Sequence, residues 1–132
     1  MDRKVFVEDY NKYISEGKLL IEKLDRELFP VKSALWFYYA DSNSWKFLIA
    51  SSKLEEDGPI KVYKTIQRIL EKENFNSLTL NDISIITTSH DLIQLLASAI
   101  STGEKSIAGI RFQANTINNT YIEDAYIYRL SK

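Results

Sequence analysis

The residue types best suited to chemistry surround His90, the single histidine of this 132-residue chain. The run Thr88-Ser89-His90-Asp91 follows an apolar segment typical of a strand and precedes one typical of a helix. Ligands collect beyond the carboxyl ends of strands in open sheets, and helix N-termini present N–H groups to anions. With Arg111 from the next predicted strand, residues 87–91 therefore predict a site that binds or hydrolyses a phosphate compound or nucleotide.

A helix cap explains the same segment without a ligand, and we consider it the more frequent explanation. Ser89 or Asp91 would accept backbone N–H groups, and Asp91 with Gln94 has the spacing of a capping-box variant. The consecutive Ser-His-Asp is not a catalytic triad. Triad side chains converge in space, whereas neighbours in sequence at a helix start diverge.

A second candidate is a basic face on the helix predicted from Gly58-Pro59 to Glu73. Its four cations fall within an arc of ~80° at about 100° per residue, and they are Lys61, Lys64, Arg68 and Lys72. Such a face could contact nucleic-acid phosphates or an acidic partner. It lies opposite the apolar side of the helix, so a solvated outer face is the favoured explanation.

Aromatic residues crowd the predicted hairpin around Leu35–Ala50 and the last predicted strand, Tyr121–Leu130. Cross-strand packing in the core explains most of them. Aromatic residues are also enriched at interfaces, and few predicted helices remain to cover one face of the sheet. We therefore predict an interaction surface on the residues Trp36, Tyr38, Tyr126 and Tyr128.

The carboxylates offer little catalytic promise. Glu123 and Asp124, with Arg111 and Arg129 as possible partners, could suggest acid–base chemistry or a divalent cation. The two carboxylates point to opposite faces of a strand, however, and cannot serve one site. We expect an ordinary salt bridge between Arg111 and Glu123. Glu16-Gly17-Lys18 has nuclease-like spacing but falls on a predicted helix. With no cysteine and one histidine, the chain cannot form a structural zinc site or an HExxH motif. We expect no metal and no cofactor.

Composition is that of an ordinary globular domain, and we expect residues 1–132 to form one domain. The 17 Lys plus Arg nearly balance the 18 Asp plus Glu, which disfavours a dedicated nucleic-acid binder. No apolar run reaches the ~18 residues of a membrane span, and the charged start does not fit a signal peptide. We expect a cytoplasmic protein without membrane contact.

The elements that must position these residues follow from periodicity and from turn residues. We predict an α+β fold in the order α-β-β-α-β-α-β-β, with a mixed five-stranded sheet, two antiparallel hairpins and packed helices. Residues 83–114 are long enough for a parallel crossover. The predicted helices span 2–29, 58–73 and 92–101, and the predicted strands span 33–40, 45–50, 83–87, 106–114 and 121–130.

Finer expectations concern single segments. Residues 53–57 predict an acidic loop, and Gly103 a helix terminator. Residues 83–87 predict a central strand covered on both faces. The helix from 92 is apolar almost all round and should be deeply buried. Asn118-Asn119 tolerate the positive φ of a turn, and Gly17 permits close approach of another element.

The chain resembles small uncharacterised bacterial proteins of similar length. The resemblance lies in Leu35–Tyr39, Trp45–Ser51, Gly58-Pro59 with Ile66, and Tyr121–Arg129, and it extends over most of the chain. It implies a bacterial cytosolic protein and attaches no activity, cofactor or catalytic residue.

The leading hypothesis is a non-enzymatic binding or accessory protein that acts through protein–protein contacts. A homodimer through the aromatic sheet face or the long first helix is its simplest form. The first alternative is the phosphate or nucleotide site at residues 87–91. The second is a nucleic-acid accessory protein that uses the basic face of the helix at 61–72.

Overall fold

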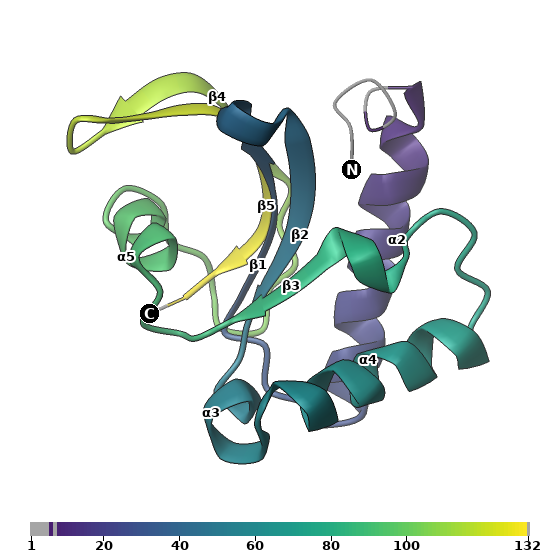
Figure 1. Ribbon diagram of the computed structural model, residues 1–132. Helices are drawn as coiled ribbons and strands as arrows, with labels where there is room; N and C mark the ends of the chain where they lie inside the picture. The colour runs from purple at the N-terminus through teal and green to yellow at the C-terminus, as the bar shows by residue number, and fades with distance from the viewer. Residues whose placement is uncertain (1–5, 7, 132) are drawn as a thin grey trace.

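The computed structural model describes residue 6 and residues 8–131, and it confirms the α+β class and the mixed five-stranded sheet. Figure 1 shows the arrangement. The helices are α2 (Tyr10–Arg26), α3 (Lys53–Asp57), α4 (Pro59–Lys72) and α5 (Asp91–Ala97), with short 3-10 turns η1 (Ala40–Ser42) and η2 (Leu80–Asp82). The strands are β1 (Ser33–Tyr39), β2 (Ser44–Ala50), β3 (Ile83–Ile86), β4 (Ile110–Ile117) and β5 (Thr120–Leu130).

The strand order is β3-β2-β1-β5-β4, and every neighbouring pair is antiparallel except β2 and β3. The predicted parallel crossover over 83–114 is therefore wrong, because β3 and β4 lie at opposite edges. The parallel pair is β2–β3, and the α3–α4 segment makes the long connection that such a pair requires. Likewise, β3 is an edge strand and not the central strand that its apolar sequence suggested.

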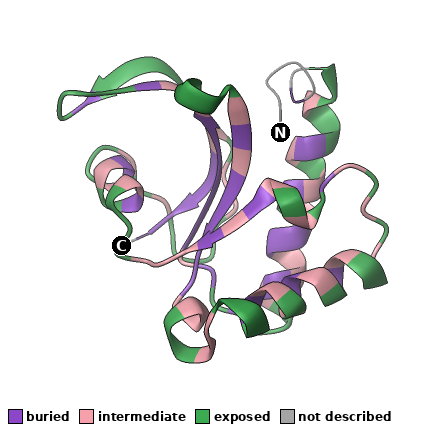
Figure 2. Ribbon diagram, viewed as in Figure 1, coloured by how far each residue is buried: buried purple, intermediate pink, exposed green. Residues whose placement is uncertain are grey.

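The sheet is curved, with α5 on its concave side and α2 and α4 on the other (Figure 1). Figure 2 shows the buried residues concentrated along the strands and on the helix sides that face them. The core on the α2 side is rich in aromatic rings, including Trp36, Trp45 and Phe47. The core on the α5 side is mostly aliphatic, with Leu35, Leu48 and Ile127 among its buried members.

Helix α2 ends at Arg26, before the predicted limit at Phe29 and Pro30. It begins at Tyr10, and residues 2–5 and 7 of the predicted helix lie outside the described residues. Leu28 adopts a left-handed backbone with φ 58°. Its N–H donates to Asp25 O at 3.1 Å, and the Phe29 N–H donates to Leu24 O at 2.9 Å. This is the hydrogen-bond pattern of a Schellman motif. The Schellman turn therefore ends the helix before Pro30, the residue predicted to end it.

Strand β5 contains an irregularity that simple alternation did not predict. Ala34 pairs with Arg129 while Leu35 pairs with Ile127, so Tyr128 is an extra residue in β5. A bulge of this kind shifts the following residues to the other face. Tyr128 and Arg129, predicted on opposite faces, both contact α2, through Ile14 and Asp25 respectively.

Other boundaries also differ from the predictions. Residues 53–57 form helix α3 and not a loop. Helix α5 ends at Ala97, so Gly103 lies outside it, and Ile93 and Leu96 are its only buried residues. The helix is therefore not buried all round. Strand β4 begins at Ile110 and ends at Ile117, whereas residues 106–114 were predicted. Its end is later because the turn consists of Asn118 and Asn119 only.

Two short-range predictions are confirmed. Asn118 and Asn119 have φ of 45° and 67°, as a tight hairpin turn between β4 and β5 requires. Gly17 is buried, and a methyl group there would overlap the Tyr128 hydroxyl.

Candidate functional site

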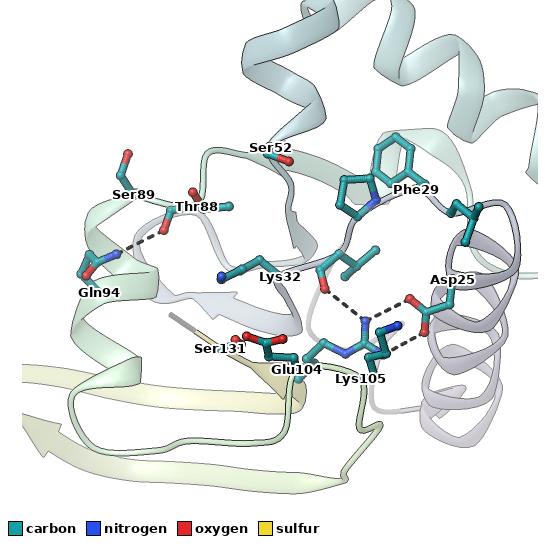
Figure 3. A pocket seen from close by; sticks show the side chains of 14 residues that line it. Asp25, Phe29, Lys32, Ser52, Thr88, Ser89, Gln94, Glu104, Lys105 and Ser131 are labelled. Atoms are coloured by element: carbon teal, nitrogen blue, oxygen red, sulfur yellow. Dashed lines mark hydrogen bonds and ion pairs between the residues drawn. The ribbon is translucent and has the colours of Figure 1, made fainter.

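A cavity of about 750 Å³ opens where the end of α2, the start of α5 and the end of β5 meet. Figure 3 shows the side chains around it. Ligand sites of small molecules are commonly ~300–1,000 Å³. The lining consists of Asp25, Leu28, Phe29, Pro30, Val31, Lys32, Ser52, Thr88, Ser89, Gln94, Glu104, Lys105, Arg129 and Ser131.

Arg129 is the most deeply buried polar residue of this lining, at 1% exposure. Its Nη1 donates to Asp25 Oδ1 at 3.1 Å and to Val31 O at 3.1 Å. Its Nη2 donates to Asp25 Oδ2 at 2.8 Å, and its Nε donates to Ser106 O at 2.9 Å. A guanidinium has five N–H groups. These bonds use four, and the fifth, on Nη2, has no recorded partner among the described residues.

Three local features place this guanidinium in the cavity wall. The β5 bulge turns Arg129 toward α2. Asp25 stands in the last turn of α2, where the carboxylate can form a bidentate pair. The Schellman turn then redirects the chain so that the Val31 carbonyl faces the same guanidinium. Without these partners, a buried arginine would destabilise the fold by several kcal/mol.

The remaining polar groups give the cavity a positive balance. Its lining holds three cations (Lys32, Lys105 and Arg129) and two carboxylates (Asp25 and Glu104), a formal net charge of +1. In Figure 3, Lys32 extends into the space between Asp25 and Gln94. Hydroxyl groups complete the lining, from Ser52, Thr88, Ser89 and Ser131. Cations with hydroxyl donors are the groups that bind carboxylates and phosphates.

The predicted segment 87–91 contributes to this cavity only in part. Thr88 and Ser89 line it, whereas His90 and Asp91 do not. His90 is the N-cap of α5, where its Nδ1 accepts the Leu92 N–H at 3.2 Å. The cap was predicted, but on Ser89 or Asp91. Gln94 donates to Thr88 O at 3.2 Å and forms no capping box with Asp91.

Arg111 lies apart from segment 87–91, so the predicted combination of the two is wrong. It is on the opposite edge strand, where Nε and Nη2 each donate to Asp124 at 2.6 Å. Its partner is therefore Asp124 and not the predicted Glu123. The hydrogen bond to Asp124 raises the pKa of Arg111 above its usual value. The guanidinium carbon also lies 5.1 Å from the Tyr10 ring centre, a cation–π contact.

The predicted aromatic interaction surface is part of the core. Trp36 and Tyr128 are fully buried, Tyr38 is buried, and Tyr126 is half-buried. Helix α2 covers them, because its apolar side packs over this face of the sheet. Trp36 donates to the Tyr128 hydroxyl at 3.2 Å, and that hydroxyl donates to Ile14 O at 2.8 Å. The prediction is wrong because one long helix suffices to cover the face.

The four residues of the basic face are exposed on α4, as the helical projection predicted. Arg68 donates to Glu27, the C-cap of α2, at 2.7 Å, and Lys61 pairs with Asp57 at 3.9 Å. Lys64 and Lys72 are exposed on the same helix. Contact of this face with nucleic acid stays a prediction.

Among residue 6 and residues 8–131, no helix is long and apolar enough to cross a membrane. Within the same residues, no three His, Asp or Glu side chains are grouped so that they could hold a metal ion.

Sequence reasoning missed the cavity residues Asp25, Lys32, Lys105 and Arg129. One signal was present. Arg129 is a charged residue within the otherwise apolar end of a predicted strand, between Tyr128 and Leu130. Charged residues are almost never fully buried unless they are paired, so such a position indicates a specific partner.

No protein-family model, no curated protein and no solved structure matches this chain. The resemblance to small bacterial proteins therefore stays a prediction, and the cavity has to be interpreted from its own chemistry.

Proposed function

We propose that this chain is a non-enzymatic binding domain that holds a small anionic ligand in the Arg129 cavity. The observation that carries this proposal is the buried guanidinium of Arg129 in the cavity lining, which four hydrogen bonds hold and whose fifth N–H has no partner among the described residues. Lys32 and Lys105 supply further positive charge. The proposal retains Thr88 and Ser89 from the predicted phosphate site and replaces Arg111 by Arg129.

The cavity groups favour binding over catalysis. Arg129 has a fixed charge and four hydrogen bonds that hold it in place. His90, the one histidine, uses its Nδ1 to cap α5. An arrangement of fixed donors around a concave space recognises an oxyanion by shape and charge.

Nuclear magnetic resonance of the ¹⁵N-labelled protein tests the proposal with phenyl phosphate as the probe. We expect amide shifts to concentrate around residues 28–32, 88–94, 104–105 and 129–131. Lys32→Gln and Lys105→Gln should each weaken binding roughly 2- to 5-fold, as expected for a partly exposed charge pair of up to ~1 kcal/mol. Lys64→Gln on α4 removes the same charge away from the cavity and should bind as the original chain does. Shifts elsewhere, or equal binding by all variants, contradict the proposal.

A second candidate function is self-association, and one observation favours it. Strand β4 is an edge strand that pairs with β5 alone among the described strands, and most of its residues are exposed. An exposed edge presents unpaired backbone groups to another strand. We propose a two-fold dimer in which β4 pairs with β4 of a second copy. This replaces the aromatic face as the contact surface.

Size-exclusion chromatography with light scattering tests the dimer. The original chain should elute as a dimer, and Thr116→Lys, which adds charge to the exposed edge, should shift it to monomer at the same concentration. Lys64→Gln serves as the control. A monodisperse monomer at high concentration contradicts self-association and leaves the ligand proposal unaffected.

A further inference from the structure

Leu28 is the most unusual residue of the cavity lining. It is 87% exposed, and its φ of 58° is rarely adopted by residues other than glycine, asparagine or aspartate. A left-handed backbone costs an ordinary L-residue roughly 1–2 kcal/mol. Glycine is the usual residue at this position after a helix. The turn that ends α2 requires this left-handed backbone, yet the residue that adopts it carries a large, exposed apolar side chain.

The local fold makes no use of the Leu28 side chain. In a Schellman motif, the stabilising apolar contact joins the residue after the left-handed one to the third helical residue from the end. Here those residues are Phe29 and Leu24, and both are buried in the same core cluster. Leu28 stands outside this contact, so its side chain serves neither the turn nor the core.

The position of Leu28 in the cavity gives its side chain a role. The lining is divided between an exposed apolar part, Leu28 and Pro30, and a cationic part, Arg129, Lys32 and Lys105. A space of about 750 Å³ is larger than an inorganic anion needs and suits an organic molecule. A ligand with an oxyanion at one end and an apolar body at the other would contact both parts.

Building on the proposed function, we infer that the ligand is an amphipathic organic anion. Its carboxylate or phosphate group binds at Arg129 with Lys32 and Lys105, and its aryl or alkyl body covers Leu28. Leu28 is then the residue that determines specificity, because it distinguishes organic anions from inorganic ones. Leu28 lines the cavity with its side chain exposed, so a bound ligand can bury it.

Leu28→Gly provides the sharpest test, because its effects on stability and on affinity have opposite signs. The variant relieves the left-handed strain, so its Tm should be equal to or higher than that of the original chain. Its affinity for phenyl phosphate should fall on the order of 5-fold to 10-fold, since a leucine loses its apolar contact. Its affinity for inorganic phosphate should not change.

Two controls separate the apolar contact from other effects. Leu28→Asn keeps a side chain of moderate size and tolerates the left-handed backbone, but it should lose affinity for phenyl phosphate as the glycine variant does. Ile60→Ala removes an exposed apolar side chain of α4 that does not line the cavity, and it should bind normally. Parallel titrations with benzoate and acetate show whether the preferred head group is a carboxylate or a phosphate.

The outcomes distinguish the two proposals. If phenyl phosphate and benzoate bind at the cavity and Leu28→Gly leaves their affinity unchanged, the amphipathic ligand is refuted and the anion cavity stands. The same holds if inorganic phosphate binds as tightly as phenyl phosphate. Both proposals fail if none of the four anions binds, namely phenyl phosphate, inorganic phosphate, benzoate and acetate. They also fail if Lys32→Gln and Lys105→Gln leave the affinity unchanged.

Discussion

Gly17 shows how one missing side chain lets a helix approach the sheet. A Cβ at this position would overlap the Tyr128 hydroxyl and lie 3.0 Å from Trp36 Nε1. The same hydroxyl bonds both Trp36 Nε1 and Ile14 O. The cost of glycine in a helix interior, up to ~1 kcal/mol relative to alanine, is thus offset by close packing against two large aromatic residues.

We predict that Gly17→Ala lowers the free energy of unfolding by about 1–3 kcal/mol, because overpacking outweighs the gain in helix propensity. Urea unfolding measures the change. Tyr128→Phe removes the clashing hydroxyl, so the double variant should lose less than the sum of the two single losses. A Gly17→Ala chain as stable as the original would contradict the close approach.

Tyr128 also predicts a pH dependence. Burial, opposed in part by the hydrogen bond from Trp36, raises the pKa of its phenol far above the usual value of 10.0. Above that value the unfolded chain loses the proton while the folded chain keeps it. Stability is therefore fully present below pH 10.0 and falls as the pH rises beyond it.

We expect urea midpoints to decrease as the pH rises above about 10, with a smaller decrease in Tyr128→Phe. Burial also raises the pKa values of Tyr13, Tyr39 and Tyr126, so part of the slope remains in that variant. Identical slopes for the two chains would show that Tyr128 ionises as freely in the fold as in the unfolded chain.

At the scale of elements, polar side chains on and just after helix α2 bind neighbouring segments of the fold. Glu16 accepts the Ser77 N–H at 3.0 Å and the Leu78 N–H at 3.0 Å, which fixes the connection between α4 and β3. Arg68 of α4 pairs with Glu27 just beyond the end of α2. The carboxylate of Glu16, from the triplet with nuclease-like spacing, thus binds backbone N–H groups in the fold.

We predict that Glu16→Gln accelerates amide hydrogen exchange at Ser77 and Leu78 about 10-fold, since a charge-assisted hydrogen bond becomes a neutral one. Exchange in the central strands β1 and β5 should change much less, because the effect is a local opening. Glu55→Gln, on the exposed side of α3, is the matched control. Equal protection at the two amides would contradict the anchoring role.

At the scale of the whole molecule, the pair of Asp25 and Arg129 joins the end of the first long helix, α2, to the end of the last strand, β5. The two residues are 104 positions apart in sequence, and the same guanidinium also holds the carbonyls of Val31 and Ser106. One side chain therefore ties α2, the approach to β1, the loop before β4 and the end of β5. The cavity exists because these four segments converge there.

We predict that Asp25→Asn lowers the free energy of unfolding by about 2 kcal/mol, because it leaves a buried guanidinium without its counter-charge. Chemical denaturation followed by tryptophan fluorescence measures the loss. Asp57→Asn breaks two long pairs with partly or fully exposed lysines, with Lys53 at 3.8 Å and with Lys61 at 3.9 Å, and should cost less than ~1 kcal/mol. Equal losses in the two variants would mean that the burial of Arg129 has little energetic weight.

The sequence by itself determined the features that depend on near neighbours. The apolar period of α4, the alternation of β2 and the Asn118-Asn119 turn each involve residues a few positions apart, so they could be predicted directly. The α+β class followed from the order of these elements. The N-cap of α5 was also predictable as a cap, although His90 forms it instead of its neighbours.

Only the tertiary structure decided where β3 lies, which side Arg129 faces and which residues share the cavity. Each depends on pairing between distant segments, since the bulge at Tyr128 appears only when β5 is aligned with β1. A shift of one residue exchanges the two faces of a strand. The predicted site kept Thr88 and Ser89 and lost Arg111, because β4 lies at the edge of the sheet opposite β3. The arginine in the cavity wall is Arg129, and its carboxylate partner lies at the other end of the chain.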